Sequence, residues 1–174
     1  MKRILLTALL VLASSETFAD VLMFDASFFY DSSTAADKSN LTQKEGHLFI
    51  GTPVAVKEQL YLGANFIITD EQATNTVGTG TTEIGPRLNY YLNQDKTYLV
   101  MLAWHPYVKI DNAPEYISAW SYAAGIGYEM KINTNFFIGA SIVYHALNQK
   151  NDNTQEEAKS STVRPMINFS FRFK

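Results

Sequence analysis

Side chains alternate strictly between two kinds over residues 162–173. Odd positions from Val163 onward are apolar, and even positions are polar or charged except for Met166. Successive side chains of a β-strand point to opposite faces, whereas a helix would spread both sets around its surface. The segment therefore predicts a strand with one apolar and one polar face. The two sets are Val163, Pro165, Ile167, Phe169, Phe171 and Phe173, and Arg164, Met166, Asn168, Ser170 and Arg172.

The same period of two residues recurs in seven further segments, at 21–30, 44–54, 59–69, 81–92, 97–109, 116–130 and 136–147. Short turns such as 93–96 and 133–135 alternate with longer polar stretches such as 31–43 and 148–161. Short turns at one end and longer loops at the other are typical of transmembrane barrels. The predicted fold class is therefore all-β: a closed eight-stranded antiparallel up-and-down transmembrane β-barrel.

One face of each predicted strand is nearly free of charged side chains, and most charges fall on the opposite face. An eight-stranded barrel has an interior just wide enough to be filled by side chains, so charges there can pair with one another. The opposite, apolar face then needs lipid around it, and closure leaves no strand edge exposed. A soluble barrel would enclose the apolar face instead. The predicted inward charges are Asp25, Glu45, Glu83, Arg87, Lys109, Glu129, Arg164 and Arg172.

Three histidines, His47, His105 and His145, also fall on the predicted inward face. Three imidazoles can in principle bind zinc. We expect them instead to join the charged residues in one interior polar network, with no metal and no cofactor. Within that network, Arg172 is expected to pair with Asp25, because the last strand must meet the first to close the barrel, with Glu129 as a second partner.

The N-terminus has the layout of a cleavable signal peptide. Lys2 and Arg3 precede an apolar run over residues 4–12, and small residues surround an expected cleavage site after Ala19. The run is too short to span a bilayer as a helix, which needs about 20 residues; the alternative is a buried N-terminal helix. We expect export by the Sec route, a cleaved segment 1–19 and a barrel domain over 20–174. The chain has no cysteine, which excludes disulfides and a lipid-anchored N-terminus.

These features together resemble the small bacterial outer-membrane barrels of the OmpA transmembrane domain and OmpX type. In that family the last strand ends in a phenylalanine that the barrel assembly machinery recognises. The resemblance therefore implies an assembly signal at Phe169, Phe171 and Phe173, although Lys174 follows the last aromatic residue. It also implies outer-membrane lipid and lipopolysaccharide as surroundings, with periplasmic chaperones and the assembly machinery as partners during biogenesis.

Some barrels of this size are lipid A-modifying enzymes, so a catalytic site must be considered. The deacylase members resemble lipases and carry a His-x-Ser pair, but Ala146 and Leu147 follow His145. Ser141 lies four residues before His145, which is more than about 10 Å along a strand rising about 3.4 Å per residue. Loop residues of the palmitoyltransferase members cannot be matched. We therefore predict that the protein is not an enzyme.

The charge balance argues against nucleic acid as a partner. Removing Lys2, Arg3 and Glu16 from totals of 14 basic and 17 acidic residues leaves 12 and 16, a formal net charge of −4. The acidic stretch 148–161 lacks a calcium-loop pattern and is expected to be a solvated surface loop. We predict a non-catalytic barrel with a structural or surface-interaction role. The alternative is a narrow, porin-like channel for small or apolar solutes, and a lipid A-modifying enzyme is third.

Overall fold

A computed structural model describes residues 22–34, 40–54, 59–73, 78–111 and 117–173 of the chain. The predicted signal peptide and its cleavage site lie outside these residues. All regular structure in the described ranges is β-strand, so none of these residues forms a helix long and apolar enough to cross a membrane. The strands are β1 (Leu22–Thr34), β2 (Asn40–Pro53), β3 (Leu60–Ala73), β4 (Thr79–Tyr91), β5 (Tyr98–His105), β6 (Tyr107–Ile110), β7 (Ile117–Lys131), β8 (Phe136–Asn151) and β9 (Glu157–Phe173).

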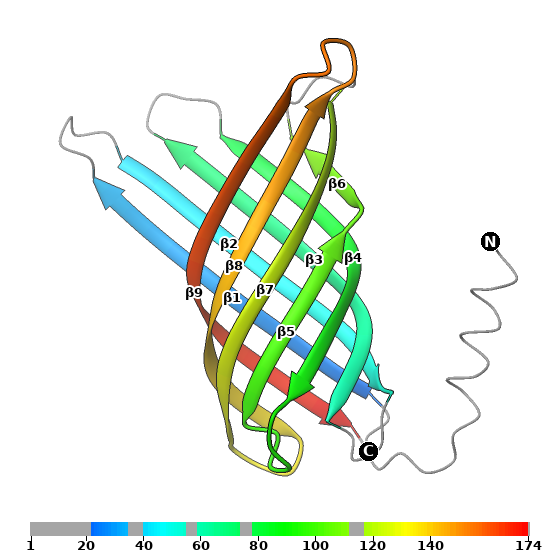
Figure 1. Cartoon of the computed structure of the whole chain (residues 1–174). Coiled ribbons are helices and arrows are strands. Elements are labelled where there is room, and N and C mark those ends of the chain that lie inside the picture. Colours follow the sequence, from blue (N-terminus) through cyan, green and yellow to red (C-terminus); the bar gives the residue numbers. More distant parts are fainter. Residues whose placement is uncertain (1–21, 35–39, 55–58, 74–77, 112–116, 174) are drawn as a thin grey trace, which may run out of the picture.

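The strands form one closed antiparallel sheet (Figure 1). β1 to β4 and β7 to β9 pair with their neighbours in chain order, and β5 pairs with β4 and β7. β9 returns to β1, with Leu22 opposite Phe173 and Phe28 opposite Ile167. β5 and β6 are two parts of one strand that both pair with β4. The sheet is therefore an eight-stranded up-and-down barrel, which confirms the predicted fold class.

A β-bulge separates β5 from β6. Arg87 of β4 lies opposite Ala103, but Ile84 lies opposite Tyr107, so residues 104–106 face only residues 85 and 86 of β4. Pro86 and Pro106 both stand in this stretch, and neither has a backbone N–H to donate to the ladder. Prolines in sheets are confined to edges and bulges for this reason.

The bulge reverses the faces of the residues that follow it. Lys109 projects outward, with its side chain 67% exposed and its Nζ 3.9 Å from a carboxylate oxygen of Asp111. Val108 is the residue opposite the buried Glu83. The prediction that Lys109 belongs to the interior network is therefore wrong, because an unbroken alternation across Pro106 was assumed. Beyond His105, which faces Ser121, the strand also has no register pairs with β7 in the described part.

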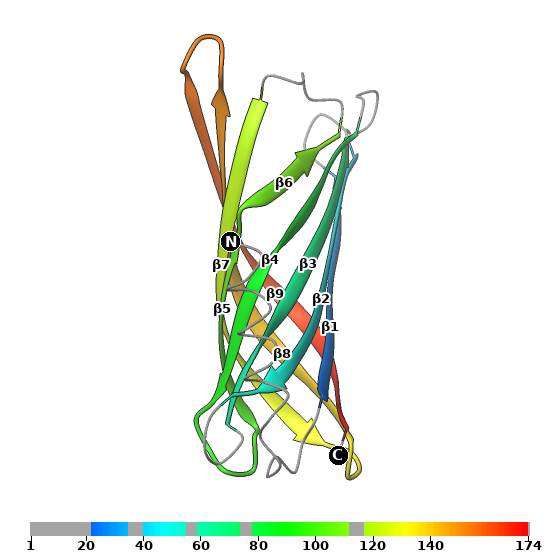
Figure 2. The same ribbon diagram turned by 90° about the vertical axis from the view of Figure 1, so that its right-hand side faces the viewer.

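The strands continue well beyond the predicted loop boundaries at one end of the barrel. β8 and β9 form a hairpin that projects past the other strands, and only residues 152–156 make its turn (Figure 2). The Asn151 N–H donates to the Glu156 carbonyl at 2.9 Å, and Gln155 takes a positive φ of 60° to close the turn. The prediction of a solvated loop over 148–161 is therefore wrong for most of that stretch, which is strand.

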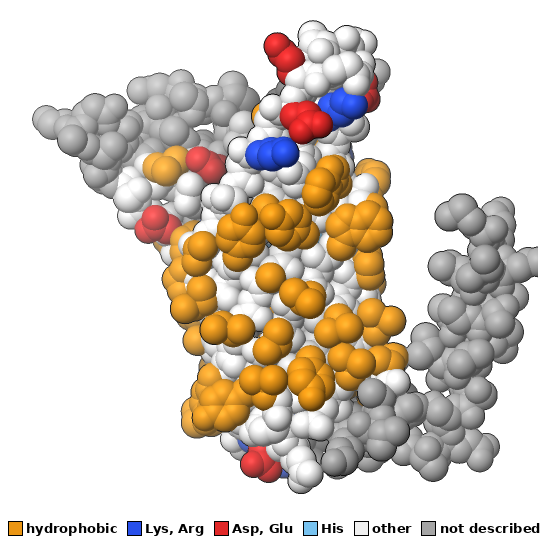
Figure 3. Space-filling view, viewed as in Figure 1, with side chains coloured by type: hydrophobic (Ala, Val, Ile, Leu, Met, Phe, Trp, Pro, Cys, Tyr) orange, Lys and Arg blue, Asp and Glu red, His pale blue; other side chains and the backbone are white. Residues whose placement is uncertain are grey.

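Apolar side chains cover the outer surface in a broad band, with charged groups above and below it (Figure 3). Leu102, Ile126 and Ile167 project from the middle of this band and are 55%, 64% and 56% exposed. The alternate residues point inward, as Met101 and Asn168 do, and are almost completely buried. The barrel is thus apolar outside and largely polar inside, which is the polarity that the sequence predicts.

We predict that Ile167→Arg and Leu102→Arg each destabilise the folded protein by about 2–4 kcal/mol, because a charge in the middle of the band would meet lipid. Asn168→Ser, on the inner face, should cost about 1 kcal/mol through loss of the 3.0 Å bond that Ser141 Oγ donates to it. Urea-induced unfolding in phospholipid vesicles measures the three free energies. Equal tolerance at the three sites would show that the two faces have been assigned in reverse.

Candidate functional site in the barrel interior

The interior near the first residues of β1 combines an apolar cluster with buried ion pairs. The Arg172 guanidinium lies 2.6 Å from Glu129 Oε2 and donates to the Lys96 carbonyl at 3.1 Å. It also lies over the rings of Phe137 and Tyr91, at 3.6 and 4.4 Å from their centroids, which favours a cation. The surrounding buried cluster consists of Met23, Phe49, Tyr61, Tyr91 and Leu99.

Asp25 pairs across the barrel and not with the neighbouring strand. Its Oδ2 accepts a 2.6 Å bond from Nη2 of Arg87 on β4. The prediction of an Arg172–Asp25 pair is therefore wrong, and the second partner named for Arg172, Glu129, holds it instead. Register explains the difference, because β1 and β9 place Met23 opposite Arg172, so Asp25 is free to extend toward the facing wall.

Arg87 connects this ion pair to the next layer of the interior. Its Nε donates to Asn89 Oδ1 at 2.7 Å, and its guanidinium lies 5.0 Å from the centroid of the Phe49 ring. Its Nη1 lies 3.4 Å from Asn65 Oδ1. Asn65 in turn donates through Nδ2 to Nε2 of His105 at 2.8 Å. A chain of polar contacts thus runs from Asp25 toward the middle of the barrel.

Glu83 is the centre of a second polar group. His145 Nε2 lies 2.9 Å from its Oε2, and Thr81 Oγ1 donates to its Oε1 at 2.9 Å. Ser121 Oγ also donates to this carboxylate, and His105 Nδ1 lies 2.9 Å from the same hydroxyl. Because Asn65 occupies Nε2 of His105 as a donor, the imidazole proton is on Nδ1 and is donated to Ser121.

Glu45 is the centre of a third polar group, on the side of the barrel nearest to β9. It accepts hydrogen bonds from Arg164 and, at 2.6 Å, from His47 Nε2. The Arg164 guanidinium also lies 5.3 Å from the centroid of the Phe29 ring. The Arg164–Glu45 pair joins β9 to β2 across β1, and both side chains are buried.

A second apolar cluster fills the space between these polar groups. It consists of Ile67, Met101, Ala103, Ala123, Val143 and Met166, with Phe29 packed against it. None of these residues belongs to the predicted interior network, and neither do the neutral polar residues Asn65, Asn89 and Ser121 that link the charges. Their alternate positions along the strands do predict that they lie on the inner face. What the pattern could not show is which of them would touch.

Ten of the eleven predicted network residues lie buried in the interior, and Lys109 is the exception. They form three groups in place of the single network that was expected: the Arg172–Glu129 pair, a chain that runs from Asp25 and Arg87 through His105 to Glu83 and His145, and the contacts of Glu45 with His47 and Arg164. Each of the four inward carboxylates has a cationic or imidazole partner.

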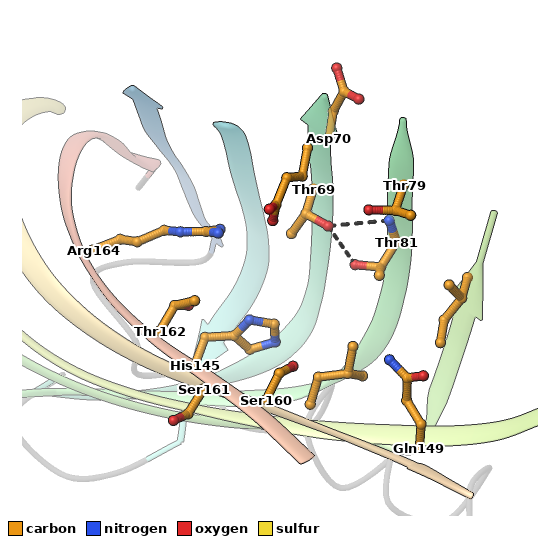
Figure 4. A pocket seen from close by; sticks show the side chains of 13 residues that line it. Thr69, Asp70, Thr79, Thr81, His145, Gln149, Ser160, Ser161, Thr162 and Arg164 are labelled. Atoms are coloured by element: carbon orange, nitrogen blue, oxygen red, sulfur yellow. Dashed lines mark hydrogen bonds between the residues drawn. The ribbon is translucent and has the colours of Figure 1, made fainter. Parts of the chain in front are cut away.

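A cavity of about 330 Å³ lies above the last two groups, at the end of the barrel from which the β8–β9 hairpin projects (Figure 4). Six of its lining residues carry a hydroxyl group, and Thr69 Oγ1 lies 2.8 Å from Thr81 Oγ1. His145 and Arg164, each paired to a carboxylate, line it from below. The full lining is Thr69, Asp70, Glu71, Thr79, Thr81, Ile110, His145, Leu147, Gln149, Ser160, Ser161, Thr162 and Arg164.

The serines near the histidines are not arranged as nucleophiles. Ser141 donates to Asn168 at 3.0 Å, and its neighbour along the inward row is Val143, not His145. Ser121 is near both His105 and Glu83 but is completely buried and donates its proton to the carboxylate. A nucleophilic serine needs a base as its acceptor and access to substrate. Among the described residues, no three or more His, Cys, Asp or Glu are placed to hold a metal ion.

The C-terminal aromatic residues lie on the outer face of β9 and contact neighbouring strands. Phe171 stacks on Phe136 of β8, with ring centroids 4.7 Å apart, and Phe169 packs against Phe28 of β1 at 6.3 Å. Phe173 is exposed at the end of the strand. Their role as an assembly signal stays a prediction.

Comparison with known proteins gives matches in structure but not in sequence. No protein-family model and no curated protein matches the chain. OmpT, an outer-membrane protein of Vibrio cholerae, matches over 90% of this chain and 53% of its own, at 13% identity and a TM-score of 0.36. The chain thus spans about half the length of that protein.

Two smaller barrels match over most of their own length. The outer-membrane protein AlkL in DMPC bilayers matches over 92% of this chain and 94% of its own, at 10% identity and a TM-score of 0.42. The porin KdgM in complex with disordered oligogalacturonate matches over 88% and 100%, at 10% identity and a TM-score of 0.32. Likenesses this distant carry no argument about activity. The barrel fold rests on the strand pairing of this chain, and the closer resemblance to OmpA and OmpX stays a prediction.

We predict that Arg172→Ala lowers the free energy of unfolding by about 3–5 kcal/mol, because it leaves the Glu129 carboxylate buried without its cation. Replacing both Arg172 and Glu129 by Met should recover most of this loss, since no unpaired charge remains. Lys44→Ala is the matched control, because its 3.7 Å contact with Asp70 is exposed to solvent. Urea unfolding of the four proteins measures these differences, and equal losses in the single and double variants would contradict the assignment.

Proposed function

We propose that the protein is a non-catalytic barrel of the bacterial outer membrane, with a filled interior and a structural or surface-interaction role. The observation that carries this proposal is the inverted polarity of the barrel. Ion pairs such as Arg87–Asp25 and Arg172–Glu129 are buried inside, whereas large apolar side chains such as Leu102 and Ile167 face outward. Such a surface is unfavourable in water and favourable in lipid.

Aromatic side chains at the two edges of the apolar band support a membrane location. Tyr30 and Trp120 lie near its upper edge, and Tyr98, Tyr128 and Phe173 near its lower edge, all on the outer face. Tyrosine and tryptophan favour the two interfaces of a bilayer. We further propose that lipopolysaccharide and outer-membrane lipid surround the band. The barrel assembly machinery and periplasmic chaperones would act on the C-terminal aromatic residues during biogenesis.

Two features of the interior support a closed barrel. Apolar clusters and polar groups alternate along its length, so layers of packed side chains cross the path of a solute. The inward charges are also nearly balanced, with four carboxylates facing three guanidinium groups. A selective pore usually shows an excess of one sign along its wall.

The projecting β8–β9 hairpin suits a role outside the membrane. Its charged residues include Lys150, Asp152, Glu157 and Lys159. Figure 3 shows charged side chains above the apolar band. Lys159 and Glu157 form an exposed contact at 3.6 Å. A hairpin of this length gives the barrel a rigid polar extension on the side of the hydroxyl-lined cavity.

The location predicts how the protein fractionates. We expect it to remain in the outer-membrane fraction after salt and carbonate washes, and to be released only by detergent. We also expect unheated and boiled samples to migrate differently on denaturing gels, because a closed barrel resists unfolding by the gel detergent. Recovery of the folded protein from the periplasm without detergent would refute the membrane assignment.

Conductance across a planar bilayer separates the closed barrel from the alternative narrow channel, which the 330 Å³ cavity at the mouth favours. We expect the purified protein to insert without producing a steady open-channel current, because the Glu83 and Glu45 groups close the cavity from below. A stable, ion-selective current through the unmodified protein would place the channel first. Fatty acid released from lipopolysaccharide would instead contradict the non-catalytic proposal.

A further inference from the structure

The ladder that closes the barrel is shorter than the strands that form it. Register pairs between β1 and β9 end at Phe28 and Ile167. β1 continues to Thr34 and β9 begins at Glu157, and both stretches keep their pairs only with β2 and β8. The upper ends of β1 and β9 diverge in Figure 1. We call the stretch in which β1 and β9 have no register pairs, residues 29–34 and 157–166, the notch.

A proline stands where the ladder stops. The Arg172 N–H donates to the Asn135 carbonyl at 2.8 Å, on the side of β8. Alternate residues of an antiparallel strand direct their N–H and C=O groups to opposite neighbours, so odd residues of β9 face β1. Pro165 is the first odd residue beyond Ile167, and it has no N–H to offer. The sequence itself therefore removes the donor that would extend the ladder past Phe28.

The lower part of the notch lies within the apolar band. Tyr30 on β1 and Val163 on β9 flank it on the outer face and are 66% and 64% exposed, with Pro165 exposed between them and the last register pair. Outward side chains become polar only at Ser32 and Ser161. Unpaired backbone groups at membrane depth cost several kcal/mol each unless a polar partner reaches them. This part of the barrel therefore needs a hydrogen-bonding partner that can approach from the lipid.

The inner side of the notch is closed at its base but polar above. Phe29 packs on the apolar cluster, and Arg164 lies over its ring while bound to Glu45. Thr162 lies two residues before Arg164 on β9, and its buried Oγ1 has no hydrogen-bond partner. Ser33 on β1 carries a further hydroxyl group at an inward position, and Ser161 on β9 carries one at an outward position.

We propose that the notch binds the hydroxylated headgroup of an outer-leaflet amphiphile, whose acyl chain lies along Tyr30 and Val163. Backbone groups of β1 and β9 and the Thr162 hydroxyl are its hydrogen-bond partners. An uncharged glycosyl or glycerol headgroup fits better than an anionic one, because Arg164 is already neutralised by Glu45 and Asp31 is exposed nearby. This inference rests on the proposed membrane location.

Photo-crosslinking in phosphatidylcholine nanodiscs tests the site. The probe is dodecyl glucoside with a diazirine on the first chain carbon, and adducts are mapped by mass spectrometry. We expect labelling concentrated on residues 29–33 and 161–165, which excess unlabelled dodecyl glucoside abolishes and dodecyl sulfate does not. A diazirine-bearing dodecane without a headgroup should label the outer face around Ile142 and Ile167 without preference for the notch.

Two variants examine the stated chemistry. Pro165→Val restores an N–H toward β1, so the ladder should extend to Tyr30. The new amide should then be protected from hydrogen exchange, and glucoside labelling should fall several-fold. Thr162→Val removes only the unpartnered hydroxyl and should also reduce glucoside labelling several-fold. The difference in gel migration between its unheated and boiled samples should stay unchanged. Pro86→Val is the matched control, because Pro86 is equally outward but lies on β4 opposite the β5–β6 bulge, away from the notch.

The outcomes separate the site from the membrane assignment. Uniform dodecane labelling of the outer face without glucoside enrichment at the notch would overturn the site and leave the membrane location intact. Equal labelling by dodecyl glucoside in the unmodified protein and both notch variants would also overturn it, as would full competition by dodecyl sulfate. No labelling of Ile142 and Ile167 by the dodecane probe would refute the membrane location itself.

Discussion

Backbone hydrogen bonding between the first and last strands is the constraint on which the rest of the structure depends. Once β1 and β9 are joined, the lower barrel has no free strand edge, and its outer face can be wholly apolar. The charges must then lie inside, where each carboxylate needs a partner because unpaired burial is costly. The ion pairs of Asp25, Glu45, Glu83 and Glu129 are thus a consequence of closure and not a separate device.

The strands and their faces could be predicted from sequence because the signal is local. Period-two alternation identified the segment around Ile167 as readily as the segment around Phe28. Lys109 was placed on the wrong face because the alternation was assumed to continue across Pro106, although a proline within a strand indicates an edge or a bulge. It also failed at residues 148–161, whose polar composition indicates exposure to water but does not distinguish a loop from a projecting strand.

The pairing of the interior charges could be predicted only in part. The alternation of side chains places Arg172, Asp25 and Glu129 inside the barrel. All three occur near the same end of the barrel and therefore lie at one level. Which carboxylate meets which guanidinium depends on side-chain reach across the barrel, which register and shear determine. The outer cavity was missed for a similar reason, because its lining comes from five strands whose relative heights no single segment reveals.

The topology also determines the order in which the barrel can assemble. Each ladder from β1–β2 to β8–β9 joins segments that are close in the chain, so hairpins can form one after another at little cost in chain entropy. The β1–β9 ladder alone joins the two ends of the described sequence, and it carries fewer pairs than β1–β2 or β8–β9. Because its closure costs the most chain entropy, we expect it to be the last ladder to form. Resistance of the barrel to mechanical or thermal opening is governed by the seven residue pairs from Leu22–Phe173 to Phe28–Ile167.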